Sequence, residues 1–274
     1  MYTHFKPPSP HAPITVPRLH DMKARHEKIV VLTAYDASFA AQCDAAGIDV
    51  ILVGDSLGMV VQGRSTTLPV TLDDIVYHTA AVSRGVATAL LVADLPFMSY
   101  RDAPTALASA AKVMTEGGAA MVKLEGAGYV LDAIHGLAAR DIPVCAHLGL
   151  TPQSVHKLGG YRVQGKTKTA AERLVADAKA VADAGADLLV LECVPATLAK
   201  RITAEVSVPT IGIGAGSDCD GQVLVLYDML GITPGKRPRF SKDFLAGCDS
   251  IGAALKQYAH AVRNGEFPAA EHSF

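Results

Sequence analysis

Eight short apolar runs, separated by helical patterns, constrain the fold of this chain more than any other feature. The runs are continuous rather than alternating in polarity, which is typical of parallel strands covered on both faces. They lie near residues 29–34, 50–54, 89–94, 119–124, 142–147, 187–192, 208–213 and 222–227. Strands that alternate with helices in this way predict a parallel (β/α)₈ TIM barrel. The alternative is a doubly wound open sheet, which would need fewer strands and a ligand site in one crevice.

Helical patterns fill the intervals between these runs. We expect a short N-terminal helix that starts after Thr15, has Pro17 in its first turn and ends near His26. Capping and stop signals predict further helices from Thr71–Asp74 to about Arg84, from Arg101 to Glu116, from a capping box at Thr169–Glu172 to near Gly185, and at 243–263.

The length of 274 residues fits one barrel domain with a sizeable core. We place this domain at 16–264. Residues 1–15 are rich in Pro and His and are expected to form a disordered N-terminal tail. Residues 265–274 are expected to form a C-terminal tail.

Composition excludes several classes of function. A net charge of −2 gives no support for nucleic-acid binding, which usually shows a basic patch or stripe. The N-terminus lacks the apolar segment of a signal peptide, and no apolar run approaches the roughly 20 residues that span a bilayer. We therefore expect a soluble, cytoplasmic protein that binds no membrane. Reduced thiols and no zinc site are expected from five dispersed cysteines, Cys43, Cys145, Cys193, Cys219 and Cys248.

Four of the predicted strands lead to ionisable residues. The residues are Asp55, Asp94, Lys123 with Glu125, and Glu192. A buried strand gains nothing from a charge at its end, because desolvating a carboxylate costs several kcal/mol unless it is paired or bound to a metal. Since a (β/α)₈ barrel builds its active site from the carboxyl ends of several strands, these residues predict one site.

The acidic residues among them indicate a metal. Asp55 and Asp94 follow neighbouring strands, which lie about 4.8 Å apart, so their carboxylates can reach one cation. Glu125 follows the next strand and could join them directly or through water. Oxygen ligands without accompanying Cys or clustered His favour Mg²⁺. The alternative is that each Asp caps a turn or helix, but all three carboxylates together favour the metal.

For each of the remaining candidate site residues, a purely structural role is an alternative to a role in chemistry. Lys123 shares a strand face with Glu125 and could contact a substrate carboxylate or carbonyl, form an ion pair, or do both. His147, at the end of the fifth predicted strand, is either a hydrogen-bonded core residue or a site residue. Glu192 follows a five-residue apolar run, so desolvation could raise its proton affinity to that of a general base. Otherwise it is a helix-start residue ahead of Pro195.

Three further features remain open. The Gly212–Gly216 segment follows a strand and could bind phosphate through backbone N–H groups, or could be a turn that needs positive φ. Gly159–Tyr161 lies in a long polar stretch of the kind that forms lids. Cys193, beside Glu192, is expected to pack rather than to act as a nucleophile.

Several long motifs, which occur in the same order along the chain, resemble those of the ketopantoate hydroxymethyltransferase family. The resemblance runs from about Ile14 to about Arg263. The motifs are Thr33–Asp36, Val53–Val60, Ala93–Phe97, Val122–Gly126, His147–Ser154, Leu191–Pro195, Ile211–Gly216 and Asp228–Gly231. The resemblance implies an enzyme of pantothenate synthesis. It would transfer a hydroxymethyl group from 5,10-methylenetetrahydrofolate to 3-methyl-2-oxobutanoate, giving 2-dehydropantoate through a Mg²⁺-stabilised enolate. It also implies a homo-oligomer, typically a decameric ring.

The resemblance also implies roles for the candidate residues. Asp55 and Asp94 would bind Mg²⁺, with Glu125 in or beside the ligand shell, and Glu192 would be the base. Contacts to the keto acid would come from Asp55, Ser56, Asp94, Lys123 and His147. The folate pocket is marked by no motif, and without Trp the pterin ring would contact Tyr, Phe or non-aromatic side chains.

Two rival functions are compatible with the predicted fold. One is a metal-dependent lyase or phosphoenolpyruvate-mutase-like enzyme, which would share the Asp pair and the enolate. The chain lacks a Lys-Lys-Cys-Gly-His stretch of the isocitrate lyase kind, which counts against that member. The other is a catalytically silent scaffold, which should lack several of the site residues. Dependence of turnover on folate and Mg²⁺ would distinguish these classes.

Overall fold

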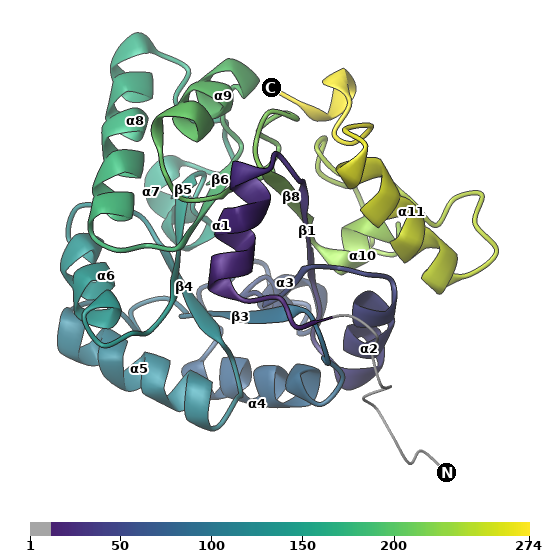
Figure 1. Cartoon of the computed structure of the whole chain (residues 1–274), viewed down its shortest axis with the longest axis horizontal. Coiled ribbons are helices and arrows are strands. Elements are labelled where there is room, and N and C mark those ends of the chain that lie inside the picture. Colours follow the sequence, from purple (N-terminus) through teal and green to yellow (C-terminus); the bar gives the residue numbers. More distant parts are fainter. Residues whose placement is uncertain (1–11) are drawn as a thin grey trace.

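The strands form a closed parallel barrel in the computed structural model, which describes residues 12–274 (Figure 1). Neighbours in the barrel follow the order of the sequence, and the last strand pairs with the first. This closure confirms the (β/α)₈ TIM barrel and excludes the open sheet. The strands are β1 Ile29–Thr33, β2 Val50–Val53, β3 Leu90–Asp94, β4 Met121–Glu125, β5 Val144–Gly149, β6 Leu188–Glu192, β7 Thr210–Ile213 and β8 Gly221–Leu224.

Helices surround the barrel on its outer side (Figure 1). The longer ones are α2 Ala37–Ala45, α4 Leu72–Ser83, α5 Ala103–Thr115, α6 Val130–Ala138, α8 Lys168–Asp183, α9 Ala196–Glu205 and α11 Ile251–Arg263. Short helical segments lie in the connections. They are α3 Leu57–Val60, η1 Pro152–Ser154, α7 Val155–Leu158, α10 Leu226–Met229 and η2 Ala270–His272.

The N-terminal helix α1, Val16–Ala24, lies across one opening of the barrel (Figure 1). It starts where the sequence predicts, because the Thr15 side chain accepts a hydrogen bond from the Arg18 N–H. Leu19 and Met22 pack against apolar side chains inside the barrel and close its amino-terminal end. Residues 1–11 of the predicted tail lie outside the described residues.

Strand periodicity determines which side chains enter the barrel. In β3, Leu90 and Val92 belong to the interior cluster, whereas Leu91 and Ala93 pack with the helices. Because successive side chains on a strand point to opposite faces, Asp94 also points into the barrel, at the carboxyl end of β3. By the same alternation, the side chains of Lys123 and Glu125 in β4 point into the barrel, on the face that Met121 occupies.

Three predicted boundaries are wrong. Helix α8 starts at Lys168, because Thr167 rather than Thr169 provides the cap and accepts the Ala170 N–H. Helix α11 starts at Ile251 instead of near 243. The Asp243 side chain accepts the N–H groups of Leu245 and Ala246, which forms a turn, and Ser250 then caps the helix. The last strand ends at Leu224, and α10 follows where the sequence predicts its continuation.

Residues 265–274 pack on the barrel. Phe267 is buried against Phe244 and Tyr258, and the Phe274 carbonyl accepts the Ala196 N–H at the start of α9. Within residues 12–274, none of the helices has the length and apolar character needed to cross a bilayer.

Candidate active site

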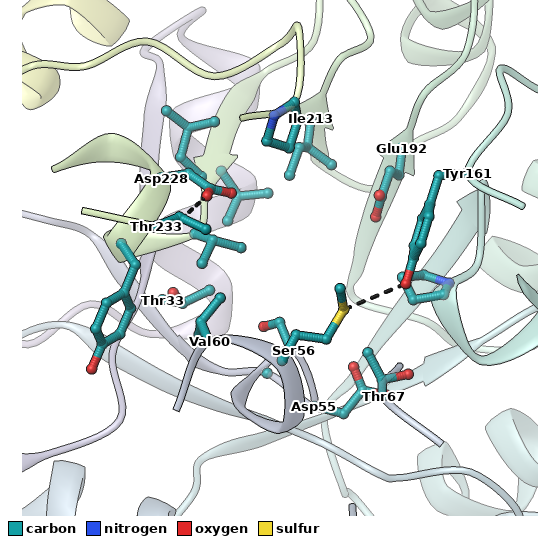
Figure 2. A pocket seen from close by; sticks show the side chains of 18 of the residues that line it. Thr33, Asp55, Ser56, Val60, Thr67, Tyr161, Glu192, Ile213, Asp228 and Thr233 are labelled. Atoms are coloured by element: carbon teal, nitrogen blue, oxygen red, sulfur yellow. Dashed lines mark hydrogen bonds between the residues drawn. The ribbon is translucent and has the colours of Figure 1, made fainter. Parts of the chain in front are cut away.

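A cavity of about 1010 Å³ opens at the carboxyl ends of the strands. Its walls include every residue that the sequence singles out for chemistry, namely Asp55, Ser56, Asp94, Lys123, Glu125, His147 and Glu192. Figure 2 shows Glu192 beside Tyr161 on one wall, with Asp228 and Thr233 on the opposite wall. The prediction that residues from different strands meet at this end is therefore confirmed.

Parallel pairing of the strands explains this convergence. In the register of the sheet, Asp94 of β3 lies beside Lys123 of β4, and Glu125 lies beside His147 of β5. All four side chains are buried. Glu192 ends β6 and keeps 13% of its side chain exposed, whereas the side chains of Asp94 and Glu125 are each 3% exposed.

The Asp pair is held by hydrogen bonds from several directions. Asp94 Oδ2 accepts the backbone N–H of Asp55 at 2.9 Å, and Asp94 Oδ1 accepts the ammonium of Lys123 at 2.6 Å. Asp55 Oδ2 accepts Nε2 of Gln153 at 2.8 Å. The ion-pair alternative for Lys123 is therefore correct, and the pair lies at the floor of the cavity, where a substrate contact is compatible with it.

Charge at the strand ends favours a divalent cation. Four carboxylates at the strand ends line the cavity, those of Asp55, Asp94, Glu125 and Glu192. The other ionisable groups at the strand ends are Lys123 and His147, so with His147 protonated two negative charges remain there, apart from the charged residues of the outer wall. Burial, followed by the charges of Asp94 and Glu125, raises the pKa of Asp55 well above its usual range. A bound cation would reverse that effect, because it stabilises the ionised carboxylate.

The donor set fits Mg²⁺ with shared ligands. Among residues 12–274, no three acidic, His or Cys side chains converge as a complete protein cage for a metal. Mg²⁺ commonly uses only one or two carboxylates and completes its octahedron with water and substrate oxygens. Asp55 and Asp94 can supply such a pair, whereas Glu125 is engaged by His147 and by the Gln153 N–H.

His147 lies between two carboxylates. Its Nδ1 is 3.4 Å from Glu125 Oε1, and its Nε2 is 3.2 Å from Glu192 Oε2. Burial and the charge of Lys123 lower the pKa of His147, but the two carboxylates outweigh them and raise it to about 9. The imidazole is therefore largely protonated at neutral pH. The sequence could not reveal this cation beside Glu192, because the two residues come from different strands.

Ser56 and Thr67 contribute hydroxyl groups to the cavity wall. The Ser56 hydroxyl is 2.9 Å from that of Tyr35, and both groups can donate or accept. Thr67 is buried in the cavity wall, and its hydroxyl has no hydrogen-bond partner among residues 12–274. Thr67 carries no motif, so its place in the site follows only from the tertiary structure (Figure 2).

The outer part of the cavity is formed by segments that the sequence leaves unassigned. The Tyr161 hydroxyl contacts Met59 Sδ at 3.4 Å across the mouth (Figure 2). This contact places the predicted lid segment against the cavity. The opposite side comes from the connection between α10 and α11 and from the C-terminus, and it includes Ile232, Pro234, Lys236, Arg237, Phe240 and Phe274.

Two other sequence features are structural. Gly214 and Gly216 have φ of 61° and 79°, and a Cβ at Gly216 would lie 2.5 Å from that of Ala196. The segment therefore forms the turn with positive φ that is one of its two predicted interpretations. Cys193 is buried, and burial, followed by the charge of Glu192, raises the pKa of its thiol far above the usual range. A thiol that keeps its proton agrees with packing rather than nucleophilic attack.

Solved structures share the fold at low sequence identity. Phosphonopyruvate hydrolase superposes with a TM-score of 0.60 at 13% identity, covering 95% of this chain and 93% of the other. For oxaloacetate acetylhydrolase with 3,3-difluorooxalacetate the TM-score is 0.59 at 15% identity, covering 95% and 100%. For 2,3-dimethylmalate lyase it is 0.57 at 18%, covering 79% and 82%. These similarities support the barrel fold alone.

Sequence relatives are much more similar. The model of the family described as ketopantoate hydroxymethyltransferase matches residues 13–270. The 3-methyl-2-oxobutanoate hydroxymethyltransferase of Alkalilimnicola ehrlichii is 60% identical over 274 residues, covering 100% of this chain and 99% of the relative. That of Burkholderia mallei is 59% identical over 261 residues, covering 95% and 96%. With its site residues gathered at the end of a closed barrel, the chain belongs to the ketopantoate hydroxymethyltransferase family.

Proposed function

We propose that the protein transfers a hydroxymethyl group from 5,10-methylenetetrahydrofolate to 3-methyl-2-oxobutanoate. The product is 2-dehydropantoate, and the reaction is the first committed step of pantothenate synthesis. The observation that carries the proposal is the buried cluster of carboxylates, lysine and histidine in a chain 60% identical to a 3-methyl-2-oxobutanoate hydroxymethyltransferase. That cluster offers a cation site, a positive charge for a carboxylate and a base, which are the three requirements of enolate chemistry.

The Asp pair would hold Mg²⁺, with Glu125 beside it. A bound Mg²⁺ would supply Lewis-acid stabilisation of the negative charge that develops on the keto acid. Lys123 keeps its proton: burial lowers its pKa, but Asp94 and Glu125 raise it far above the usual range. Its ammonium and the Ser56 hydroxyl would orient the substrate carboxylate or ketone through charge-assisted hydrogen bonds.

Glu192 would remove the proton from C3 of the keto acid. Its Oε2 lies 3.2 Å from Nε2 of His147, and the flanking carboxylates raise the pKa of that imidazole to about 9. A protonated imidazole cannot accept the C3 proton, which favours Glu192 over His147 as the base. The resulting enolate would then form a C–C bond to the methylene carbon, which the folate presents as an iminium. Water would supply the hydroxyl as the C–N bond breaks, and tetrahydrofolate would leave with the proton that its nitrogen gains. His147 would hold the carboxylate in place from the side opposite the substrate.

The size of the cavity supports a second, larger ligand. A typical pocket for a drug-sized molecule measures roughly 300–1,000 Å³, and this cavity lies at the upper end of that range. A five-carbon keto acid would fill only its floor. The outer walls offer Tyr161, Tyr227 and Phe240 for a flat ring, and Arg64 and Lys236 for anionic groups. These features are compatible with a folate donor. The homo-oligomeric, decameric assembly stays a prediction.

The decisive test of the base needs no folate. The wild-type protein with Mg²⁺ should exchange the C3 hydrogen of 3-methyl-2-oxobutanoate with deuterium from solvent, as followed by NMR. Glu192→Gln keeps the shape of the side chain and removes the base. We expect the exchange to slow by about 10²–10⁴-fold, the usual contribution of general base catalysis, while keto acid binding is retained. Wild-type exchange in this variant would exclude Glu192 as the base.

The metal is tested separately by Asp55→Asn. The variant keeps the volume of the side chain but removes one of two proposed anionic ligands, so metal-dependent binding of the keto acid should be lost. Titration calorimetry with Mg²⁺, with and without EDTA, measures this directly. Asp228→Asn is the matched control, because Asp228 lines the far wall of the same cavity and accepts a hydrogen bond from Thr233. Unchanged Mg²⁺ and keto acid affinity in Asp55→Asn would disprove the metal site.

A further inference from the structure

Gln153 lies at the centre of a buried hydrogen-bond network to which no role has been assigned. Its side-chain Nε2 donates to Asp55 Oδ2 at 2.8 Å and to the Leu95 carbonyl at 3.1 Å. Its backbone N–H donates to Glu125 Oε2 at 3.0 Å. One residue from the loop after β5 therefore binds carboxylates that follow β2 and end β4, and only 6% of its surface is exposed.

Tyr100 determines which way the Gln153 amide faces. The Glu125 N–H donates to the Tyr100 hydroxyl at 3.4 Å, and that hydroxyl donates to Gln153 Oε1 at 2.5 Å. A hydroxyl has one proton, so a tyrosine that accepts from the backbone must donate onward to an acceptor. The amide oxygen therefore faces Tyr100, and the NH₂ group faces Asp55. The network has one direction, from the backbone of β4 through Tyr100 and Gln153 to Asp55.

We propose that Gln153 is a positioning residue for the metal site, acting through Asp55 and itself oriented by Tyr100. The Gln153 amide donates a hydrogen bond to Asp55 Oδ2. Asp55 Oδ1 receives no hydrogen bond from any residue in the range 12–274. A carboxylate fixed in this way presents one oxygen to a cation without losing rotational freedom when the cation binds. The inference rests on the proposed Mg²⁺ site, and it adds two residues that contact neither metal nor substrate.

The test measures metal binding without turnover. Mn²⁺ replaces Mg²⁺, since it accepts the same oxygen ligands and is visible by electron paramagnetic resonance. Gln153→Met keeps the length of the side chain and the backbone hydrogen bond to Glu125, but it lacks the amide. We expect Mn²⁺ to bind about 10–100-fold more weakly, as is typical when a partner of a metal ligand is removed.

Gln222→Met is the matched control. Gln222 is also buried, and its Nε2 donates to the Gly216 carbonyl at 2.9 Å, but it does not line the cavity. Both variants lose a buried amide, so both should unfold at a lower temperature. Only Gln153→Met should lose Mn²⁺ affinity. An equal loss of affinity in both variants would overturn the inference, because a general loss of rigidity would then explain the effect.

Tyr100→Phe tests the direction of the network. Removing its hydroxyl takes one hydrogen bond from Gln153, so Mn²⁺ affinity should fall by about 2–10-fold. In a double-mutant cycle, Tyr100→Phe should cause no further loss when Gln153→Met is already present. Additive losses would show that Tyr100 acts independently and would overturn its role.

The Mn²⁺ measurements separate the positioning role of Gln153 from the existence of the metal site. Wild-type affinity for Mn²⁺ in both Gln153→Met and Tyr100→Phe would overturn the positioning role while leaving the Mg²⁺ site intact. A wild-type protein that binds no Mn²⁺ would overturn both. If Gln153→Met does not fold, the Tyr100→Phe measurement decides, because that variant adds no atom to the core.

Discussion

Lys123 is the residue on which charge balance in the cavity depends. It is almost fully buried, its ammonium is 2.6 Å from Asp94 Oδ1, and Glu125 Oε1 is 4.0 Å away. Two carboxylates on neighbouring strand ends thus keep the lysine charged in an environment that would otherwise favour the neutral amine. A charge held there by the protein is available to an anionic substrate without prior rearrangement.

Replacement of Lys123 should separate substrate binding from metal binding. Lys123→Met retains the apolar stem and removes the ammonium, so keto acid binding should weaken by roughly 1.5–3 kcal/mol, the contribution of a charge-assisted hydrogen bond. Titration calorimetry gives this difference against Lys256→Met, a control on the exposed side of α11. A wild-type dissociation constant for the keto acid would show that Lys123 serves only the ion pair.

At the level of elements, the close approach of β5 and β6 positions the proposed base. Gly149 ends β5 with φ of 94°, and a Cβ there would overlap the Glu192 carbonyl oxygen. That oxygen accepts the Leu150 N–H at 2.8 Å. A side chain at Gly149 would force the two strand ends apart, and Glu192 would move with its backbone.

Gly149→Ala should therefore affect stability and chemistry together. The unfavourable backbone conformation costs roughly 1–3 kcal/mol of unfolding free energy, and the overlap adds to it. The C3 exchange rate per folded molecule should also fall. Gly265→Ala is the control, because Gly265 has φ of 70° with open space around its Cβ position, so it should lose stability alone. Urea unfolding and deuterium exchange measure the two effects; full exchange activity in Gly149→Ala would contradict this coupling.

For the whole molecule, closure of the barrel depends on the seam between β1 and β8. Tyr258 of α11 is fully buried there, and its hydroxyl donates to the Val31 carbonyl at 2.8 Å and lies 3.1 Å from the Gln222 carbonyl. The first and last strands are thus joined by a tyrosine of α11 that lies 36 residues after Gln222 in the sequence. This contact stabilises the seam from outside the barrel.

Tyr258→Phe should lower the unfolding free energy by about 1–2 kcal/mol, because the buried Val31 carbonyl loses its donor while the ring remains. Urea unfolding measures the change. Tyr77→Phe, at a residue 72% exposed, is the control and should stay within about 0.5 kcal/mol of wild type. Activity per folded molecule should be unchanged in Tyr258→Phe. An unchanged unfolding free energy would show that the seam does not need this hydrogen bond.

The sequence by itself determined the barrel and most of the residues at its mouth. Continuous apolar runs define buried strands, and the period of two on a strand decides which side chain points inward. Asp94, Lys123 and Glu125 could be assigned to one site because each is local to a strand end. Two helix starts were predicted wrongly, since the turn at Asp243 and the cap at Thr167 compete with similar signals nearby.

Only the tertiary structure decided how these side chains are paired. Gln153 and Asp55 are 98 residues apart in the sequence, and neither carries a local signal that predicts their hydrogen bond. The protonated His147 beside Glu192 likewise follows from the register of β5 and β6, and the outer cavity wall from the connection before α11. Local patterns report burial and periodicity, whereas hydrogen-bond partners, pKa values and cavity shape depend on distances between segments that meet only after the barrel closes.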